Sequence, residues 1–267
     1  MTEIDKWRNY SLMLNFPSPE NAEKDFLQEL LLKEIYAKTE GIVFIGGTAL
    51  SKFYGSGRFS EDLDFVMADE SYIKHAENVL SKIEAGIKNV GNYFRVSFDK
   101  TIYRDMFGYS IRIEGPLFVS SGNPAAIQKV SIDLNSREIV SLKPRLVFRN
   151  PMYENIRNYT ILVEELEELL ADKVKAAIER HAKRKGSYVR DLYDIWSISK
   201  KYDTNINFGL VKEKMRKYGV KEFSLLDFKT TLNDAKDIWE TEISAVMRTY
   251  PTYDDIKSTI ENKAHLQ

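Results

Sequence analysis

Residues 42–67, which read IVFIGGTALSKFYGSGRFSEDLDFVM, decide the fold because two strand patterns flank paired glycines and a pair of aspartates. Ile42–Ile45 is a short, unbroken apolar run with β-branched residues, which is typical of a buried strand. Gly46-Gly47 ends this strand, and Thr48–Tyr54 reads as a short helix. Apolar residues then alternate with other residues over 63–67, which predicts a second strand.

Further elements on both sides follow from apolar spacing and turn residues. A helix is predicted over 18–38, where Ser18 is a suitable N-cap and Pro19 suits the first helical position. Another amphipathic helix is predicted over 70–90. Strand-like pieces follow at 93–98, 109–113, 129–134, 144–149 and 160–163. Helical patterns then occupy 164–184, 188–200, 208–218, 226–240 and 253–265.

This order of elements predicts an α+β protein. Residues 1–163 are expected to form a mixed sheet with flanking helices, and residues 164–267 a helical domain. No Gly/Ser-rich linker marks the boundary between them.

Composition excludes several classes of protein. An apolar fraction of 43% over 267 residues allows a packed core and excludes wholesale disorder. The absence of cysteine excludes disulfides, thiolate metal sites and cysteine nucleophiles, and the 3 histidines lie far apart in sequence. An N-terminus without a secretory pattern and the lack of a long apolar run predict a soluble cytoplasmic protein without a membrane partner. The net charge of −1 does not suggest a nucleic-acid coat protein.

The acidic pair is the strongest chemical signal. Asp62 and Asp64 lie two residues apart on a predicted strand, so both carboxylates point to the same face. Like charges at that distance are destabilising unless a cation lies between them, and Mg²⁺ prefers such oxygen ligands. Asp133, in another alternating stretch, is the best candidate for a third carboxylate that would complete a two-metal site.

The paired glycines suggest a place for a phosphate. Gly46 and Gly47 allow a close backbone approach, and a helix N-terminus that follows them directs N–H groups at an anion. The Thr48 hydroxyl can add a hydrogen bond. Either the glycines or the aspartates alone would more often be structural, but together, with Arg58 and Ser60 just before the aspartates, they favour a functional site.

A second group of charged residues lies later in the chain. Lys173, Arg180 and Arg184 are spaced to share one stripe of a helix. Residues 173–190 contain seven Lys or Arg against one acidic residue. A solvated helix face and a phosphate or RNA contact are both consistent with this pattern.

A pair of aspartates follows this basic stretch. Asp191 and Asp194 are neighbours on the surface of the next helix, and Arg190 lies within reach of Asp194. The simple interpretation is a salt bridge within the helix, which is worth ~0.3–0.5 kcal/mol. The alternative is that the aspartates hold Lys173 or an arginine in place, or accept a proton from the attacking group.

Three of these segments resemble a known family. GGTAL at 46–50, followed by RFSEDLDF at 58–65, is similar to the first motif of the DNA-polymerase-β-like nucleotidyltransferases. More narrowly it resembles the AbiEii/AbiGii toxin family of abortive-infection and toxin–antitoxin systems. EELLADKVKAA at 167–177 and RDLYDI at 190–195 match further motifs of that family.

The resemblance implies a nucleotidyltransferase fold and the transfer of a nucleoside monophosphate from an NTP to an acceptor hydroxyl. It implies Mg²⁺ or Mn²⁺ as cofactor, a tRNA 3′ end as the acceptor found in some relatives, and a cognate antitoxin as partner. The metal ligands would be Asp62, Asp64 and Asp133, and Lys173, Asp191 and Asp194 would also be needed for activity. The predicted nucleotide-binding residues are Gly46, Gly47, Thr48, Arg58, Ser60, Lys173 and Arg180.

Two other functions are compatible with the motifs. A nucleotidyltransferase acting on a small molecule, such as an aminoglycoside, would need an acidic pocket for its acceptor, and the basic stretch argues against it. A catalytically silent binding module would keep the scaffold without chemistry, and the intact set of carboxylates argues against that.

Overall fold

The computed structural model describes residues 2–103, 106–217 and 224–265. The chain folds into two compact units. The first, which we call the sheet unit, comprises Met1–Ala49 and Phe59–Glu165, and the second, the helical unit, comprises Leu50–Arg58 and Leu166–Gln267. The sequence did not indicate that residues 50–58 group with the later helices, and the predicted domain boundary at 163/164 stays a prediction.

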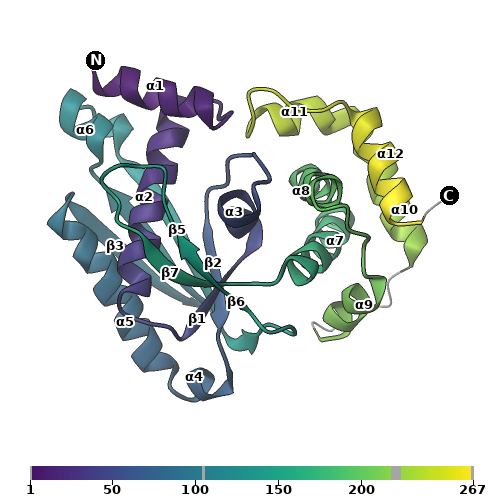
Figure 1. Cartoon of the computed structure of the whole chain (residues 1–267), viewed down its shortest axis with the longest axis horizontal. Helices are drawn as coiled ribbons and strands as arrows, with labels where there is room; N and C mark the ends of the chain where they lie inside the picture. Colours follow the sequence, from purple (N-terminus) through teal and green to yellow (C-terminus); the bar gives the residue numbers. More distant parts are fainter. Residues whose placement is uncertain (1, 104–105, 218–223, 266–267) are drawn as a thin grey trace. The chain divides into compact units, whose positions relative to one another are not determined.

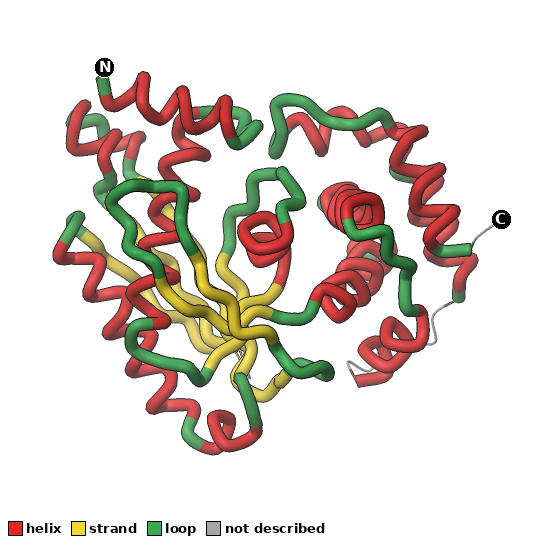
Figure 2. The backbone as a smooth tube through the Cα atoms, in the orientation of Figure 1, coloured by secondary structure: helices red, strands yellow, loops and turns green. Residues whose placement is uncertain are grey.

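A mixed sheet forms the framework of the sheet unit (Figure 2). Across the described residues its strands are β1 (Ile42–Ile45), β2 (Leu63–Met67), β3 (Val96–Tyr103), β4 (Met106–Ile113), β5 (Gln128–Ile139), β6 (Arg145–Arg149) and β7 (Tyr159–Val163). Their spatial order is β3-β4-β5-β2-β1-β7-β6. The β1/β7 and β2/β5 pairs are parallel, and the other neighbours are antiparallel. The predicted α+β class with a mixed sheet is therefore confirmed.

The strands next to the paired glycines lie in the middle of this sheet. Ile42, Val43 and Phe44 of β1 are fully buried, as expected for a central strand with an unbroken apolar run. β2 pairs with β1 on one side and with β5 on the other. The predicted strands at 42–45 and 63–67 are confirmed, and the end of β1 and the start of β2 lie side by side.

Helices and short turns complete the sheet unit. They are α1 (Glu3–Met13), α2 (Pro19–Tyr36), α3 (Gly46–Ala49), α4 (Glu70–Lys74), α5 (Ala76–Asn89), η2 (Val90–Asn92), α6 (Pro116–Ser121) and η3 (Pro124–Ala126). α2 begins where the sequence predicts, because Ser18 Oγ accepts a hydrogen bond from the backbone N–H of Asn21 at 3.3 Å. It packs against α5, β5 and β7, and Figure 1 shows it lying across the sheet in purple.

Two helical predictions in this unit need correction. The helix predicted over 70–90 is interrupted at His75 (φ −118°, ψ 33°), so that α4 is a separate turn capped by Asp69. Helical structure after the first strand begins at Gly46 rather than at Thr48, as the four-residue α3, and it continues as the π-helical turn η1 (Leu50–Tyr54) to the predicted end.

The helical unit is built around α7 and α8. Its elements are η1 (Leu50–Tyr54), α7 (Leu166–Ala182), α8 (Tyr188–Lys201), α9 (Phe208–Lys217), α10 (Leu225–Asp234), η4 (Lys236–Ile238), α11 (Trp239–Ser244) and α12 (Tyr253–Lys263). α7 contacts α8, α9 and α10, and α8 also contacts α11 and α12. The helix predicted over 226–240 is divided, because α10 ends at Asp234 and a short 3₁₀ turn precedes α11.

None of the helices in the described residues is both long and apolar enough to span a bilayer.

Candidate functional site

The predicted carboxylates lie on adjacent strands of the sheet unit. Asp64 is the second residue of β2, and it is in register with Asp133 on β5. Residues in register on neighbouring strands point to the same face of a sheet, so these two side chains share a face. Asp62 immediately precedes β2 and is exposed, whereas Asp64 and Asp133 are half-buried.

Asp62 and Asp133 also interact electrostatically. Burial raises the pKa of Asp133 above its ordinary value, and the negative charge of Asp62 raises this pKa further. A half-buried carboxylate whose ionisation is disfavoured by a neighbouring negative charge is a suitable environment for a divalent cation. The structure therefore brings Asp133 near both members of the acidic pair. Asp64 is its neighbour in strand register, and Asp62 is close enough for its charge to act on Asp133.

The donor set suits a hard cation, although it is not already arranged around one. Within the described residues, no three carboxylate or imidazole side chains lie close enough together to hold a metal ion. Carboxylate oxygens are nevertheless the ligands that Mg²⁺ and Mn²⁺ prefer. The role of Asp62, Asp64 and Asp133 as metal ligands stays a prediction.

Gly46 lies directly against one of these carboxylates. A Cβ atom at position 46 would be 2.6 Å from Asp64 Oδ2, which is closer than real Cβ atoms approach other atoms. Gly46 also has a φ of +79°, in the left-handed region that favours glycine. The first glycine of the pair is thus required by both the backbone conformation and the position of Asp64. Gly47, the second, is buried within α3.

Thr48 and Ser60 are engaged with the backbone around the acidic pair. Thr48 is 1% exposed, and its hydroxyl donates a 2.5 Å hydrogen bond to the carbonyl oxygen of Asp62. The carbonyl of Ser60 accepts a hydrogen bond from Gln28, a residue that the sequence analysis missed. The predicted contacts of Thr48 and Ser60 with a nucleotide stay predictions.

The predicted basic residues form a buried charge network in the helical unit. Arg58 makes two bonds to Asp194, from Nε to Oδ1 at 2.7 Å and from Nη2 to Oδ2 at 2.6 Å. Lys173 Nζ lies 3.0 Å from Asp191 Oδ1 and 2.9 Å from Asp194 Oδ2. Both aspartate side chains are 0% exposed, and Arg180 Nη1 reaches Asp191 Oδ2 at 2.5 Å from the surface.

The charges in this network stabilise one another. Burial alone would raise the pKa of Asp194, but the cations of Arg58 and Lys173 outweigh it and hold this pKa below its usual value. Burial would lower the pKa of Lys173, and the charges of Asp194 and Asp191 raise it instead. The simple interpretation of Asp194 as the partner of Arg190 does not hold, because Asp194 contacts Arg58 and Lys173.

Three consecutive cations of the basic stretch are exposed. Lys183, Arg184 and Lys185 follow the end of α7, and none of the three forms an ion pair within the described part of the chain. Arg184 has a φ of 54°, so the predicted helical stripe ends before it. Arg180 is the cation of the network that solvent reaches, since 43% of its side chain is exposed.

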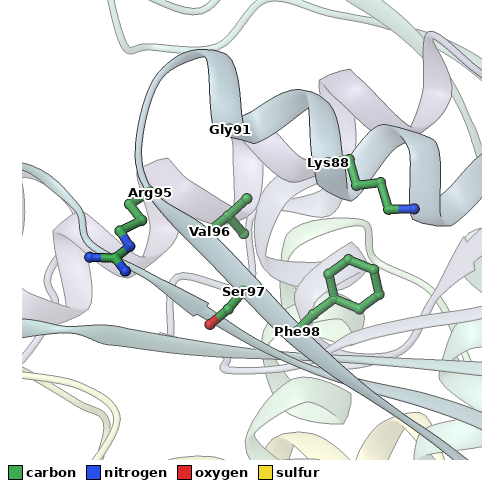
Figure 3. A pocket seen from close by; sticks show the side chains of 6 residues that line it. All are labelled: Lys88, Gly91, Arg95, Val96, Ser97 and Phe98. Atoms are coloured by element: carbon green, nitrogen blue, oxygen red, sulfur yellow. The ribbon is translucent and has the colours of Figure 1, made fainter.

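The sheet unit also contains a pocket of about 590 Å³ that is lined by none of the candidate site residues (Figure 3). It is formed where the chain leaves α5 and enters β3, and it is lined by Lys88, Gly91, Arg95, Val96, Ser97 and Phe98. None of the predicted site residues lines it, so we assign it no part in the candidate site.

Known proteins resemble this chain in family and in fold. No functionally curated protein matches the sequence. Two crystal structures from Helicobacter pylori are similar in fold. One is a protein provisionally assigned as a nucleotidyltransferase, with 18% identity, a TM-score of 0.57, and coverage of 91% of this chain and 92% of that chain. The other is JHP933, with 18% identity, a TM-score of 0.58, and coverage of 93% of this chain and 92% of that chain.

A family model described as the nucleotidyl transferase AbiEii toxin of Type IV toxin–antitoxin systems matches residues 30–262. This range includes the paired glycines, the three predicted metal ligands (Asp62, Asp64 and Asp133) and the charge network of the helical unit. The chain belongs to the AbiEii nucleotidyl transferase toxin family.

Proposed function

We propose that this protein transfers a nucleoside monophosphate from an NTP to an acceptor hydroxyl and acts in this way as a toxin. One observation carries the proposal: Asp64 and Asp133 are in register on adjacent strands, with Asp62 in electrostatic contact and Gly46 against the Asp64 carboxylate. Family membership supports a nucleotidyltransferase toxin of a Type IV system and implies an antitoxin partner.

Asp62, Asp64 and Asp133 would hold Mg²⁺, with Mn²⁺ as an alternative. A bound metal would neutralise the negative charge of the triphosphate. Such charge neutralisation accounts for much of the catalysis in phosphoryl transfer. The protein itself would position the reactants: Gly46, whose backbone lies directly against the Asp64 carboxylate, and Gly47 have no side chains to keep a phosphate from the backbone.

The two buried cations have a different proposed role from that of Arg180. Arg58 and Lys173 are covered by protein and paired with Asp194, so we assign them to fixing residues 50–58 against α7 and α8 within the helical unit. Arg180 remains partly exposed and is the member of the network that a phosphate can reach from solvent.

We propose a tRNA 3′ end as the acceptor. The support is the run of exposed cations at Lys183, Arg184 and Lys185, which no carboxylate of the described chain pairs with. Exposed Lys and Arg bind the phosphate backbone of nucleic acids, and such binding weakens as salt rises. A polycationic small molecule would be repelled by the same surface.

Incubation with each α-labelled NTP, Mg²⁺ and total RNA tests the proposal. Label in tRNA, with release of pyrophosphate, is the expected result. Label that appears only when an aminoglycoside is added would point to a small-molecule acceptor. If no pyrophosphate appears with any NTP and either acceptor, the protein is a silent binding module and the proposal is wrong.

The contact between Gly46 and Asp64 makes a specific prediction. Gly46→Ala should lower the free energy of unfolding by about 1–2 kcal/mol, because alanine is strained at this φ. The new Cβ should also displace the Asp64 carboxylate and lower the rate of nucleotide transfer about a hundredfold. Urea unfolding and a labelled-NTP assay measure the two effects.

Gly122 provides the matched control. It has a φ of +64°, and no atom lies within 4 Å of the position of its Cβ. Gly122→Ala should therefore lose similar stability and keep full transfer activity. Equal activity losses in the two variants would mean that backbone strain, and not the position of Asp64, explains the effect at Gly46.

A further inference from the structure

Residues 59–62, which lead into β2, belong to no helix or strand. Their carbonyl groups therefore do not take part in the hydrogen bonds of the sheet. This stretch begins at Phe59, which is 1% exposed and contacts Phe16 with ring centroids 5.3 Å apart. It ends at Leu63, which is fully buried. Between these two anchors lie the three residues whose backbone determines where the carboxylates of Asp62 and Asp64 project.

Gln28 of α2 binds the first two carbonyls of this stretch. Its Nε2 donates to the carbonyl oxygen of Ser60 at 2.9 Å and to that of Glu61 at 2.8 Å. A primary amide nitrogen carries two hydrogens, so one side chain satisfies both acceptors. Gln28 is completely buried, so its amide is held in one place between α2 and this stretch.

Thr48 binds the next carbonyl, that of Asp62. The three consecutive carbonyls of residues 60–62 are thus each held by a side chain from another element, α2 or α3. Lys24, one helical turn before Gln28, lies 3.5 Å from Glu61 Oε2. That pair is partly exposed and adds little.

Packing alone does not explain a glutamine at this position. Its Oε1 is buried and has no hydrogen-bond partner in the described residues. A methionine of similar length would fill the space without leaving an unsatisfied acceptor, whereas a glutamate would direct carboxylate oxygens at two carbonyls. What glutamine alone adds is a pair of donors spaced for two successive carbonyl groups.

We propose that Gln28 is a positioning residue for the acidic site. By fixing the carbonyls of Ser60 and Glu61, it sets the direction in which Asp62 and Asp64 present their carboxylates to the metal and the nucleotide. The inference rests on the proposed function, because it assigns these carboxylates to metal binding. Groups that orient metal ligands in this indirect way commonly affect metal affinity or activity by about 10- to 100-fold.

The test compares Gln28→Met with Gln128→Met. Gln128 is a buried glutamine of the same unit, and its amide donates to the carbonyl oxygen of Glu20 at 3.3 Å and to Glu23 Oε2 at 2.8 Å. Both variants lose the same two donors, but only Gln28 contacts the stretch before β2. Mn²⁺ affinity is measured by electron paramagnetic resonance without nucleotide, followed by kcat, KM for the NTP, and urea unfolding.

Gln28→Met is expected to raise the Kd for Mn²⁺ by about 10- to 100-fold and to lower kcat. Gln128→Met is expected to lose comparable stability and to keep both values. If Gln28→Met does not fold, Thr48→Val, which removes the donor to Asp62, should show the same weaker Mn²⁺ binding.

A folded Gln28→Met or Thr48→Val protein whose Mn²⁺ affinity equals that of Gln128→Met would overturn the inference while the proposed function stands. A wild-type protein that neither binds Mn²⁺ nor transfers a nucleotide would overturn the proposed function, and the inference with it.

Discussion

Asp194→Asn is expected to lower the free energy of unfolding of the helical unit by about 3–5 kcal/mol, the usual cost of removing one partner from a buried ion pair. The substitution keeps the size of the side chain but leaves Arg58 and Lys173, which are 5% and 9% exposed, without their shared counter-ion. Urea unfolding of the full chain, followed by hydrogen exchange of amides in α7 and α8, measures the loss.

Asp203→Asn is the control for this substitution. Asp203 forms an ion pair with Lys263, but its side chain is 92% exposed, so the loss of its charge should change stability little. The double variant Lys173→Met/Asp194→Asn should be less destabilised than the sum of its single variants, because the two residues act as one unit. Equal effects at Asp194 and Asp203 would show that the buried network does not stabilise the unit.

The network should also make the helical unit sensitive to acid. The pKa of Asp194 is lower in the folded protein than in the unfolded chain, so its ionisation favours the folded state. This contribution is complete above the unfolded pKa of about 4 and is lost as the pH falls through the folded pKa. Below about pH 4, therefore, Asp194→Asn should lose stability less steeply than the wild-type protein does.

Asp62→Asn and Asp64→Asn are each expected to lower nucleotide transfer by about a thousandfold or more, because phosphoryl transfer depends on positioned charge. The substitutions keep the shape of each side chain and remove one of the negative charges that a divalent metal requires. Transfer is measured with labelled NTP and the proposed acceptor, tRNA, and toxicity is measured by growth after induced expression. Both variants should also relieve growth inhibition.

Asp99→Asn provides the comparison. Asp99 is an exposed carboxylate on β3 of the same unit, and its ion-pair partner Arg112 is 3.7 Å away. This variant should keep full activity and full toxicity. If toxicity persisted in both Asp62→Asn and Asp64→Asn while transfer was lost, nucleotide transfer would not be the cause of growth inhibition.

Local sequence patterns predicted much of the sheet unit correctly. The apolar run at 42–45 and the alternation at 63–67 correctly predicted central strands. A strand that is buried on both faces needs an unbroken apolar run, and one that is buried mainly on one face needs alternating residues, so either pattern can be read from the sequence. Ser18 predicted the start of α2 because an N-cap is a contact between near neighbours. Such features need no knowledge of the tertiary fold.

The sequence could not predict contacts between distant segments. Arg58 and Asp194 are 136 residues apart, and Gln28 lies 32 residues before Ser60. Arg58, Lys173 and Thr48 were therefore predicted as nucleotide ligands, and only the structure shows that each of them binds a group of the protein. A weak signal for Gln28 did exist, since the residues one turn later on its side of α2, Leu31 and Leu32, are apolar, but nothing local indicated its partners.

The assignment of residues 50–58 to the helical unit has a consequence for how this protein can be divided. The peptide chain passes from one unit to the other at residues 49/50, 58/59 and 165/166. A fragment that started at Leu166 would retain Asp194 and lack Arg58, so it would carry an internal carboxylate deprived of half its neutralising charge. A single cut in the chain therefore cannot release a complete helical unit, because residues 50–58 would stay with the other fragment.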